Sequence, residues 1–147
     1  QIRTLAKMVD FVSVGSNDLT QYLLAVDRNN PRVANLYSAF HPAVLAALQQ
    51  VVTAAKEEKK PVSICGEMAG DPGAAILLMA MGYDVLSMNA STLLKVKSVI
   101  RSVTMDAAQD LLDQVMELDD AQMIRSAVDL ALFNAGVDRL LRSSRTN

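Results

Sequence analysis

Short apolar runs along this chain alternate with longer segments in which apolar residues recur at helical spacing. Three runs predict β-strands, at residues 11–15, 62–65 and 83–88, because each is nearly all apolar and ends in polar residues. The segments between and after them have the spacing of amphipathic helices, at residues 18–26, 42–55, 71–82, 91–100, 106–118 and 120–141. Residues 5–9 resemble the last turn of another helix, and residues 27–41 fit neither pattern and predict a long loop.

The order of these elements, strand–helix three times and then helices, predicts an α/β fold. Successive strands joined by helices pair in parallel, and strands this apolar are typical of a sheet buried on both faces. Three strands cannot close a barrel, but they are consistent with about the last three β/α units of a (β/α)8 barrel, followed by terminal helices. We therefore expect a single partial domain over residues 1–147, with barrel units in 1–103 and C-terminal helices in 104–147. The first residue is Gln1 rather than Met, which suggests an excised segment.

Each predicted strand runs directly into polar residues. The three strand ends are Ser16-Asn17-Asp18, Cys65-Gly66-Glu67 and Ser87-Met88-Asn89. The carboxyl ends of parallel strands share one edge of a sheet, so these residues are expected at one site. Backbone N–H groups, an amide, a carboxylate and a helix N-terminus suit a phosphorylated anion and a divalent metal ion.

Several of these residues also have a simpler interpretation. Asn17 and Asp18 are at the start of a predicted helix, where such residues commonly cap the backbone. Arg28 is either a solvated surface residue or a clamp that folds back over an anion. Cys65 is either a small buried hydrophobe or a thiol acting as general acid or nucleophile. His41 precedes Pro42, a helix-opening position, and we interpret it as a cap rather than as a phosphoryl carrier.

Composition excludes several classes of function. The formal net charge is −2, and no cluster of basic residues is interleaved with aromatic ones, so a nucleic-acid partner is not expected. No apolar run approaches the roughly 18 residues of a membrane span, so no membrane partner is expected either. The chain has one cysteine and therefore no internal disulfide, which fits a cytoplasmic location.

Two signatures carry a family resemblance. The run 14–22 (VGSNDLTQY), followed by 25–28 (AVDR), resembles the signature of the phosphoenolpyruvate-utilising enzymes, and 65–70 (CGEMAG) resembles their cysteine-bearing signature. Together they resemble the Enzyme I family of the bacterial phosphotransferase system, at its C-terminal phosphoenolpyruvate-binding barrel. Residues 23–30 and 87–90 are more similar to the nitrogen-regulatory form than to the sugar-uptake form.

The resemblance implies a role for each site residue. Asn17 would bind the phosphate of phosphoenolpyruvate, Asp18 would bind substrate and be one carboxylate ligand of Mg²⁺, and Arg28 would clamp the phosphate. Cys65 would be the catalytic acid that protonates the enolate to give pyruvate. The family transfers the phosphoryl group to a protein histidine and then to a histidine-containing, HPr-like phosphocarrier protein.

The same resemblance limits what this chain is expected to do. The phosphorylated histidine and the second magnesium carboxylate of the family belong to other parts of the protein, so we expect the chain alone to be inactive. The family also implies a homodimer formed through this domain. Two alternatives stay open: the phosphoenolpyruvate- and pyruvate-binding domain of an ATP-dependent dikinase, and a dimerisation or regulatory module without chemistry of its own.

Overall fold

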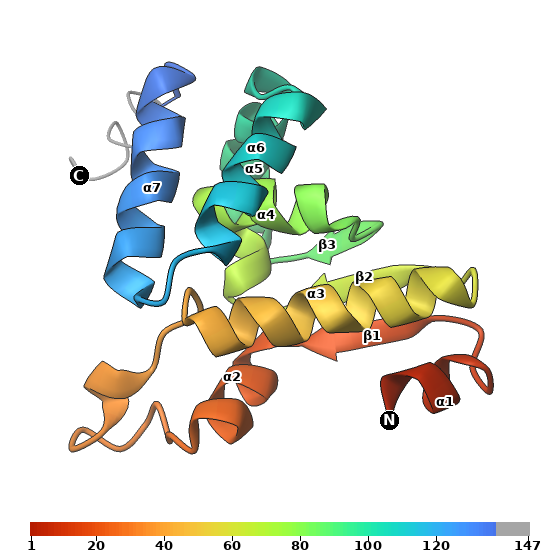
Figure 1. The fold of residues 1–147 in the computed structure, drawn as a ribbon. Helices are drawn as coiled ribbons and strands as arrows, with labels where there is room; N and C mark the ends of the chain where they lie inside the picture. Colours follow the sequence, from red (N-terminus) through yellow and green to blue (C-terminus); the bar gives the residue numbers. More distant parts are fainter. Residues whose placement is uncertain (138–147) are drawn as a thin grey trace.

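A computed structural model of the chain describes residues 1–137. Its helices and strands follow the predicted order, with two short 3₁₀ helices (η) added (Figure 1). The elements are α1 (Ile2–Ala6), β1 (Val12–Gly15), α2 (Ser16–Leu24), η1 (Ala34–Leu36), α3 (Pro42–Glu57), β2 (Val62–Cys65), η2 (Met68–Gly70), α4 (Pro72–Met81), β3 (Val85–Ser87), α5 (Ala90–Ser102), α6 (Met105–Met116) and α7 (Ala121–Asn134).

The three strands form one parallel sheet in the order β1-β2-β3. This confirms the predicted α/β fold and parallel pairing, while membership of a closed barrel stays a prediction. The register aligns Gly15 with Cys65 and Cys65 with Ser87. Aligned residues of parallel strands point to the same side of a sheet, so these three end residues share one face.

The expectation that the sheet is buried on both faces was wrong for the described residues. Val14 and Ile64, on one face, belong to the hydrophobic core together with residues of α3 and α4. On the other face Gly15, Cys65 and Ser87 are exposed, and Val85 keeps 55% of its surface accessible. The physical reason is that the helices pack on a single side, which leaves the strand-end residues open to solvent.

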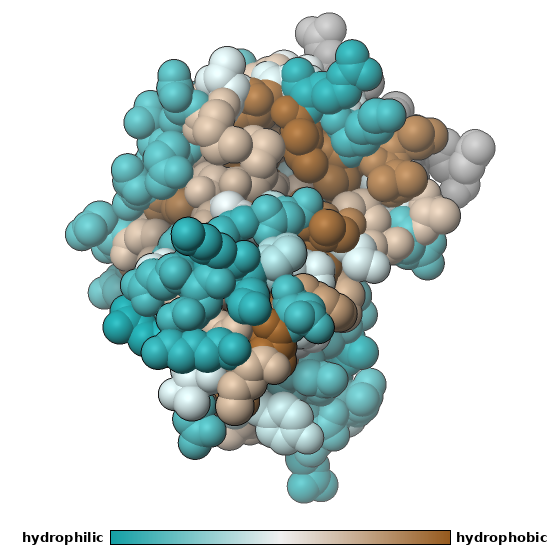
Figure 2. Space-filling view, turned by 90° about the vertical axis from the view of Figure 1, so that its right-hand side faces the viewer, coloured by the Kyte–Doolittle hydropathy of each residue, from teal (hydrophilic) through white to brown (hydrophobic). Residues whose placement is uncertain are grey.

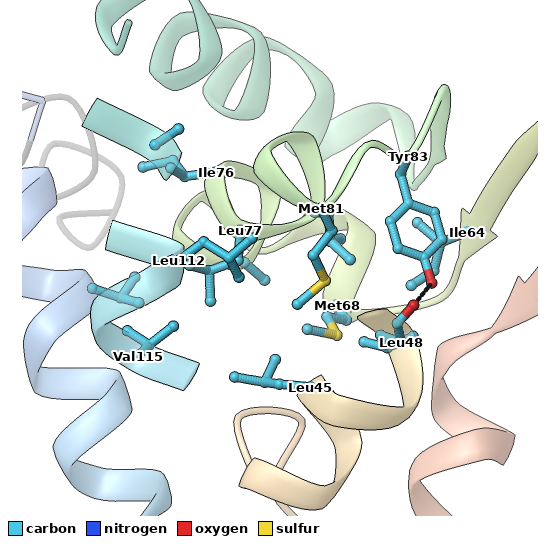
Figure 3. Packing of buried hydrophobic residues seen from close by; sticks show 14 of the residues in the cluster. Leu45, Leu48, Ile64, Met68, Ile76, Leu77, Met81, Tyr83, Leu112 and Val115 are labelled. Carbon is cyan, nitrogen blue, oxygen red and sulfur yellow. Dashed lines mark hydrogen bonds between the residues drawn. The ribbon is translucent and has the colours of Figure 1, made fainter. Parts of the chain in front are cut away.

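The core lies between the sheet and the helices α3, α4 and α6. Leu45, Leu77 and Leu112 come from these three helices and point toward one another in Figure 3. Tyr83 is buried at the edge of this cluster, and its hydroxyl donates a hydrogen bond to the Leu48 carbonyl oxygen at 3.3 Å. Burial raises the pKa of Tyr83 far above its usual value, so this donor keeps its proton.

Several element ends differ from the prediction. Helix α2 begins at Ser16 rather than at residue 18, because it follows β1 without a connecting residue. Helix α5 begins at Ala90 rather than at residue 91, because the Asn89 side chain caps it by accepting a hydrogen bond from the Ser91 N–H. Helix α7 ends at Asn134, and the predicted end at residue 141 lies outside the described residues.

The surface shown in Figure 2 is divided: the most hydrophobic residues gather mainly in its upper part, and hydrophilic residues cover most of the lower part. Among the residues described, no helix combines the length and the apolar character that crossing a membrane requires.

Candidate functional site

The three strand ends meet at a pocket of about 400 Å³. Its lining comes from the start of α2, the end of β2, η2, the end of β3 and the start of α5, with the residues that connect them: Asn17, Cys65, Gly66, Glu67, Gly70, Ser87, Met88, Asn89 and Thr92. The structure therefore brings together polar groups that are up to 75 residues apart in sequence, from Asn17 to Thr92. As the parallel register predicts, this pocket lies at the carboxyl edge of the sheet.

The first two strand ends are joined by close contacts. The buried Ser16 hydroxyl donates a hydrogen bond to the Cys65 carbonyl oxygen at 2.9 Å, and the buried Thr20 hydroxyl donates to the Ser16 carbonyl oxygen at 2.8 Å. Gly66 follows with φ +112°, and a Cβ at this position would lie 2.4 Å from Ser16 Oγ. Only glycine fits this close approach and this backbone conformation without strain, so the two signatures form one packed unit.

Asn17 does not cap helix α2, and the capping interpretation was wrong for it. The N-cap of α2 is Gly15, and no side chain makes a capping hydrogen bond there. Asn17 Oδ1 instead accepts hydrogen bonds from the Tyr37 hydroxyl at 3.4 Å and from the Glu67 backbone N–H at 3.3 Å. The amide is therefore held by a distant loop and by the second strand end.

Asp18 is exposed in the first turn of α2 and is not a cap either. One of its carboxylate oxygens lies 3.9 Å from the Cβ position of Gly15, so the carboxylate lies close to the end of β1. Asp18 makes no hydrogen bond or ion pair with any residue in the described part of the chain. Its charge is therefore available to a ligand.

The donor chemistry fits part of a magnesium site. Mg²⁺ prefers oxygen ligands and is usually bound through one or two carboxylates plus substrate phosphates. Asp18 supplies one such carboxylate, whereas Glu67 is engaged in an ion pair. Among residues 1–137 there is no group of three His, Cys, Asp or Glu side chains that could hold a metal ion. The described residues thus fit the ion as a single ligand and do not enclose it.

Arg28 folds back toward the second strand end. Its Nη1 lies 2.7 Å from Glu67 Oε1, and its backbone N–H donates to Gln21 Oε1 at 3.1 Å. The guanidinium is thus held at the rim of the strand ends by a carboxylate, where it can exchange this partner for an anionic ligand. The sequence alone did not identify Glu67 as its partner.

Cys65 is exposed, which rules out the interpretation as a buried, inert hydrophobe. It lies on the open face of the sheet, between Gly15 and Ser87 in the register, and lines the pocket. His41 caps α3, because its Nδ1 accepts a hydrogen bond from the Ala43 N–H at 3.1 Å. This confirms the predicted helix-opening role of His41.

Sequence reasoning missed Tyr37. This half-buried residue lies in the 27–41 loop, 20 residues beyond Asn17, and no periodicity marks it. Burial raises the pKa of its hydroxyl, and the negative charges of Glu67 and Asp18 act in the same direction, against a hydrogen bond with Thr20 and the charge of Arg28. Tyr37 therefore stays a hydrogen-bond donor near neutral pH.

Comparison with known proteins gives a family match. Residues 1–105 match the family described as "PEP-utilising enzyme, PEP-binding domain", where PEP is phosphoenolpyruvate. A "Phosphoenolpyruvate-dependent phosphotransferase system" protein of Salmonella typhimurium is 43% identical over 138 residues, which are 94% of this chain and 18% of that protein. A "Phosphoenolpyruvate-protein phosphotransferase" of Haemophilus influenzae is 44% identical over 125 residues, which are 85% of this chain and 22% of that protein.

A third relative is the "Multiphosphoryl transfer protein 1" of Escherichia coli K12. It is 48% identical over 118 residues, which are 80% of this chain and 14% of that protein. The chain thus spans about a fifth of the length of the curated relatives it matches. The matched family region contains all three strands and both signatures.

Proposed function

The chain belongs to the PEP-utilising enzymes, through their PEP-binding domain, and we propose that it forms part of the substrate site of a phosphoenolpyruvate–protein phosphotransferase. Such an enzyme moves the phosphoryl group of phosphoenolpyruvate to a protein histidine, from which a histidine-containing, HPr-like carrier protein receives it. The names of the relatives support this reaction. The observation that carries the proposal is the convergence of both signatures and the third strand end on one pocket.

The polar groups at the pocket suit an anionic substrate. Asn17 and the backbone at the start of α2 offer N–H donors, and the helix N-terminus favours negative charge. Arg28 supplies a planar guanidinium that can bind two phosphate oxygens once it leaves Glu67. Phosphoryl transfer depends mainly on such positioning and on charge neutralisation, because the protein has little covalent chemistry to perform.

Cys65 is assigned the proton-transfer step. Loss of the phosphoryl group from phosphoenolpyruvate leaves the enolate of pyruvate, whose terminal carbon must gain a proton. The exposed thiol in the pocket wall can give that proton and is reprotonated from solvent after the product leaves. Asp18 would be one ligand of Mg²⁺, and the bound ion would neutralise charge on the phosphate.

The chain alone is proposed to be inactive. Asp18 is a single carboxylate, and His41 serves as a helix cap, so the described residues contain neither an enclosed metal site nor a placed acceptor histidine. We further propose the nitrogen-regulatory branch, a cytoplasmic location and a homodimer formed through this domain, all on the resemblance of the sequence. Transfer of a labelled phosphoryl group from phosphoenolpyruvate to the isolated chain would overturn the proposal that the chain is inactive.

The catalytic proposal is tested by grafting this chain into the matching region of the Salmonella typhimurium relative, where 138 residues align. The chimaera should phosphorylate its carrier protein in the presence of phosphoenolpyruvate and Mg²⁺. Cys65→Ala should abolish turnover and leave phosphoenolpyruvate binding intact, and Cys65→Ser should also be inactive because a hydroxyl is a far weaker acid. Turnover that survives in both variants would show that Cys65 is not the proton donor.

The same chimaera distinguishes the alternatives. Turnover that requires pyruvate and ATP would indicate a dikinase, and a chimaera that dimerises but transfers no phosphoryl group would indicate a non-catalytic module. Sedimentation of the chain itself at high concentration tests the proposed dimer, and a strict monomer would count against it.

A further inference from the structure

The orientation of the Asn17 side chain is determined by two donors that converge on one of its atoms. The Tyr37 O–H and the Glu67 backbone N–H both point to the same terminal atom of the amide. An amide NH₂ group has no acceptor capacity, whereas the carbonyl oxygen accepts two hydrogen bonds. The atom between these donors is therefore the oxygen, and the NH₂ group lies on the opposite branch of the amide.

The oxygen side of the amide is also the side that packs against the second signature. Asn17 Oδ1 lies 3.2 Å and Asn17 Cγ 3.4 Å from the position that a Cβ on Gly66 would occupy. Glycine at residue 66 thus allows the amide carbonyl to lie directly against the backbone of the second strand end. Rotation of the amide would turn NH₂ hydrogens toward the Glu67 N–H and leave that N–H without an acceptor.

The NH₂ group is the part of Asn17 that is free to bind a ligand. It donates to no other residue in the described part of the chain, since both hydrogen bonds of this side chain use the oxygen. It is not sealed from solvent either, because residues 1–137 contain no fully buried side-chain nitrogen or oxygen without a hydrogen bond. Asn17 lines the strand-end pocket, so two N–H donors are available to an anion there.

Tyr37 is suited to hold this arrangement. Its ring is half-buried in the 27–41 loop, and burial, which raises the pKa of its hydroxyl, keeps the donor protonated near neutral pH. Arg28, close to the other end of the same loop, is tied to Glu67. Both ends of the loop thus reach the residues that form the pocket rim.

We propose that Tyr37 is a positioning residue: it fixes the Asn17 amide with its carbonyl inward, so that the NH₂ group is presented to an anionic oxygen of phosphoenolpyruvate. This inference rests on the proposed function for the identity of the ligand. The orientation of the amide rests on the hydrogen bonds alone. The two can therefore fail separately.

The test compares Tyr37→Phe with Tyr22→Phe in ¹⁵N-labelled chain observed by NMR. Both changes remove one phenolic hydroxyl, but Tyr22 is 87% exposed on α2 and its hydroxyl makes no hydrogen bond among the described residues, so it is the matched control. Without ligand, Tyr37→Phe should shift the Asn17 side-chain NH₂ signals and leave core backbone signals in place. In the presence of Mg²⁺, the dissociation constant of phosphoenolpyruvate should be about three- to tenfold higher for Tyr37→Phe than for the unmodified chain. This is the effect of one hydrogen bond.

Asn17→Asp tests the orientation from the other side. The aspartate keeps an oxygen for Tyr37 and Glu67 but presents a second oxygen to the pocket in place of NH₂. The variant should fold with an unchanged thermal midpoint and lose phosphoenolpyruvate binding.

The possible results separate the two proposals. Asn17 NH₂ signals that are identical in Tyr37→Phe and in the unmodified chain would overturn the positioning role, whatever the ligand does. Unaltered phosphoenolpyruvate binding by Asn17→Asp would overturn the outward NH₂ group. If the unmodified chain shows no response to millimolar phosphoenolpyruvate while Tyr37→Phe moves the Asn17 signals, the proposed substrate site fails and the orientation of the amide is supported.

Discussion

Gly66→Ala is the substitution that most directly tests how the two signatures fit together. Gly66 has φ +112°, a conformation that L-residues rarely adopt, and its added Cβ would lie 2.4 Å from the Ser16 hydroxyl oxygen. Ser16 is 1% exposed, and that hydroxyl donates to the Cys65 carbonyl oxygen at 2.9 Å. The hydroxyl therefore cannot move away from the methyl group without losing this hydrogen bond.

The cost has two parts. Backbone strain at a position restricted to glycine is about 1–3 kcal/mol. Loss of the Ser16 hydrogen bond adds about 1 kcal/mol. The expected loss in the free energy of unfolding is thus about 2–4 kcal/mol, which for a domain of this size lowers the thermal midpoint by roughly 5–15 °C.

Thermal and urea unfolding followed by circular dichroism measure this loss, and two further variants separate its parts. Gly136→Ala is the matched control for strain alone, because Gly136 has φ +71° and nothing within 4 Å of its Cβ position. It should cost about 1 kcal/mol. Ser16→Ala removes the atom that the new methyl group would strike, so Gly66→Ala should cost less in the Ser16→Ala background than in the unmodified chain.

Two results would refute this reasoning. A thermal midpoint for Gly66→Ala that is no lower than that of Gly136→Ala would show that the close contact has no energetic weight. Equal costs of Gly66→Ala with and without the Ser16 hydroxyl would show that the loss, however large, does not come from the junction of the two signatures.

Two more predictions concern ion pairs away from the pocket. Arg125→Ala should lower the free energy of unfolding in urea by about 1–2 kcal/mol, because Arg125 pairs with Asp71 at 2.8 Å and lies 5.0 Å from the Phe40 ring centroid; an unchanged urea midpoint would contradict it. The hydrogen bond from Lys56 lowers the pKa of Asp84 below 3.8. The Asp84 carboxylate therefore contributes to the free energy of unfolding above pH 3.8, and this contribution is lost as the pH falls through the folded-state pKa. Asp84→Asn should therefore be less stable than the unmodified chain at pH 7, by up to about 1 kcal/mol for this exposed pair. A difference in stability that does not shrink as the pH is lowered from 3.8 would contradict the assignment.

The strand positions and the polar strand ends could be predicted from sequence because both are local patterns. The exposure of Cys65 was left open, although a signal was present: Ser13 and Ser63 alternate with apolar residues and are aligned in the sheet. Such alternation is typical of a sheet with one open face, and Cys65 lies on the same side as Ser63. Treating the strands as nearly all apolar concealed this periodicity.

The contacts of Asn17 could not be predicted in the same way. Its partner Tyr37 lies in an irregular loop, where no period relates sequence position to direction in space. The pairing of Arg28 with Glu67 has the same origin, because it joins a loop to a strand end 39 residues away. Long-range contacts of this kind depend on how the loop packs, which only the folded chain determines.

These contacts bear on what the isolated chain can do. The bonds that orient Asn17, hold Arg28 and join Ser16 to the second strand end are all formed within residues 1–137. The part of the site proposed to bind the anion is therefore held together by contacts within these residues. A group of three metal ligands and a placed acceptor histidine are not found among the same residues. We accordingly expect binding and turnover to separate in this chain, with phosphoenolpyruvate perturbing the strand ends although no phosphoryl group is transferred.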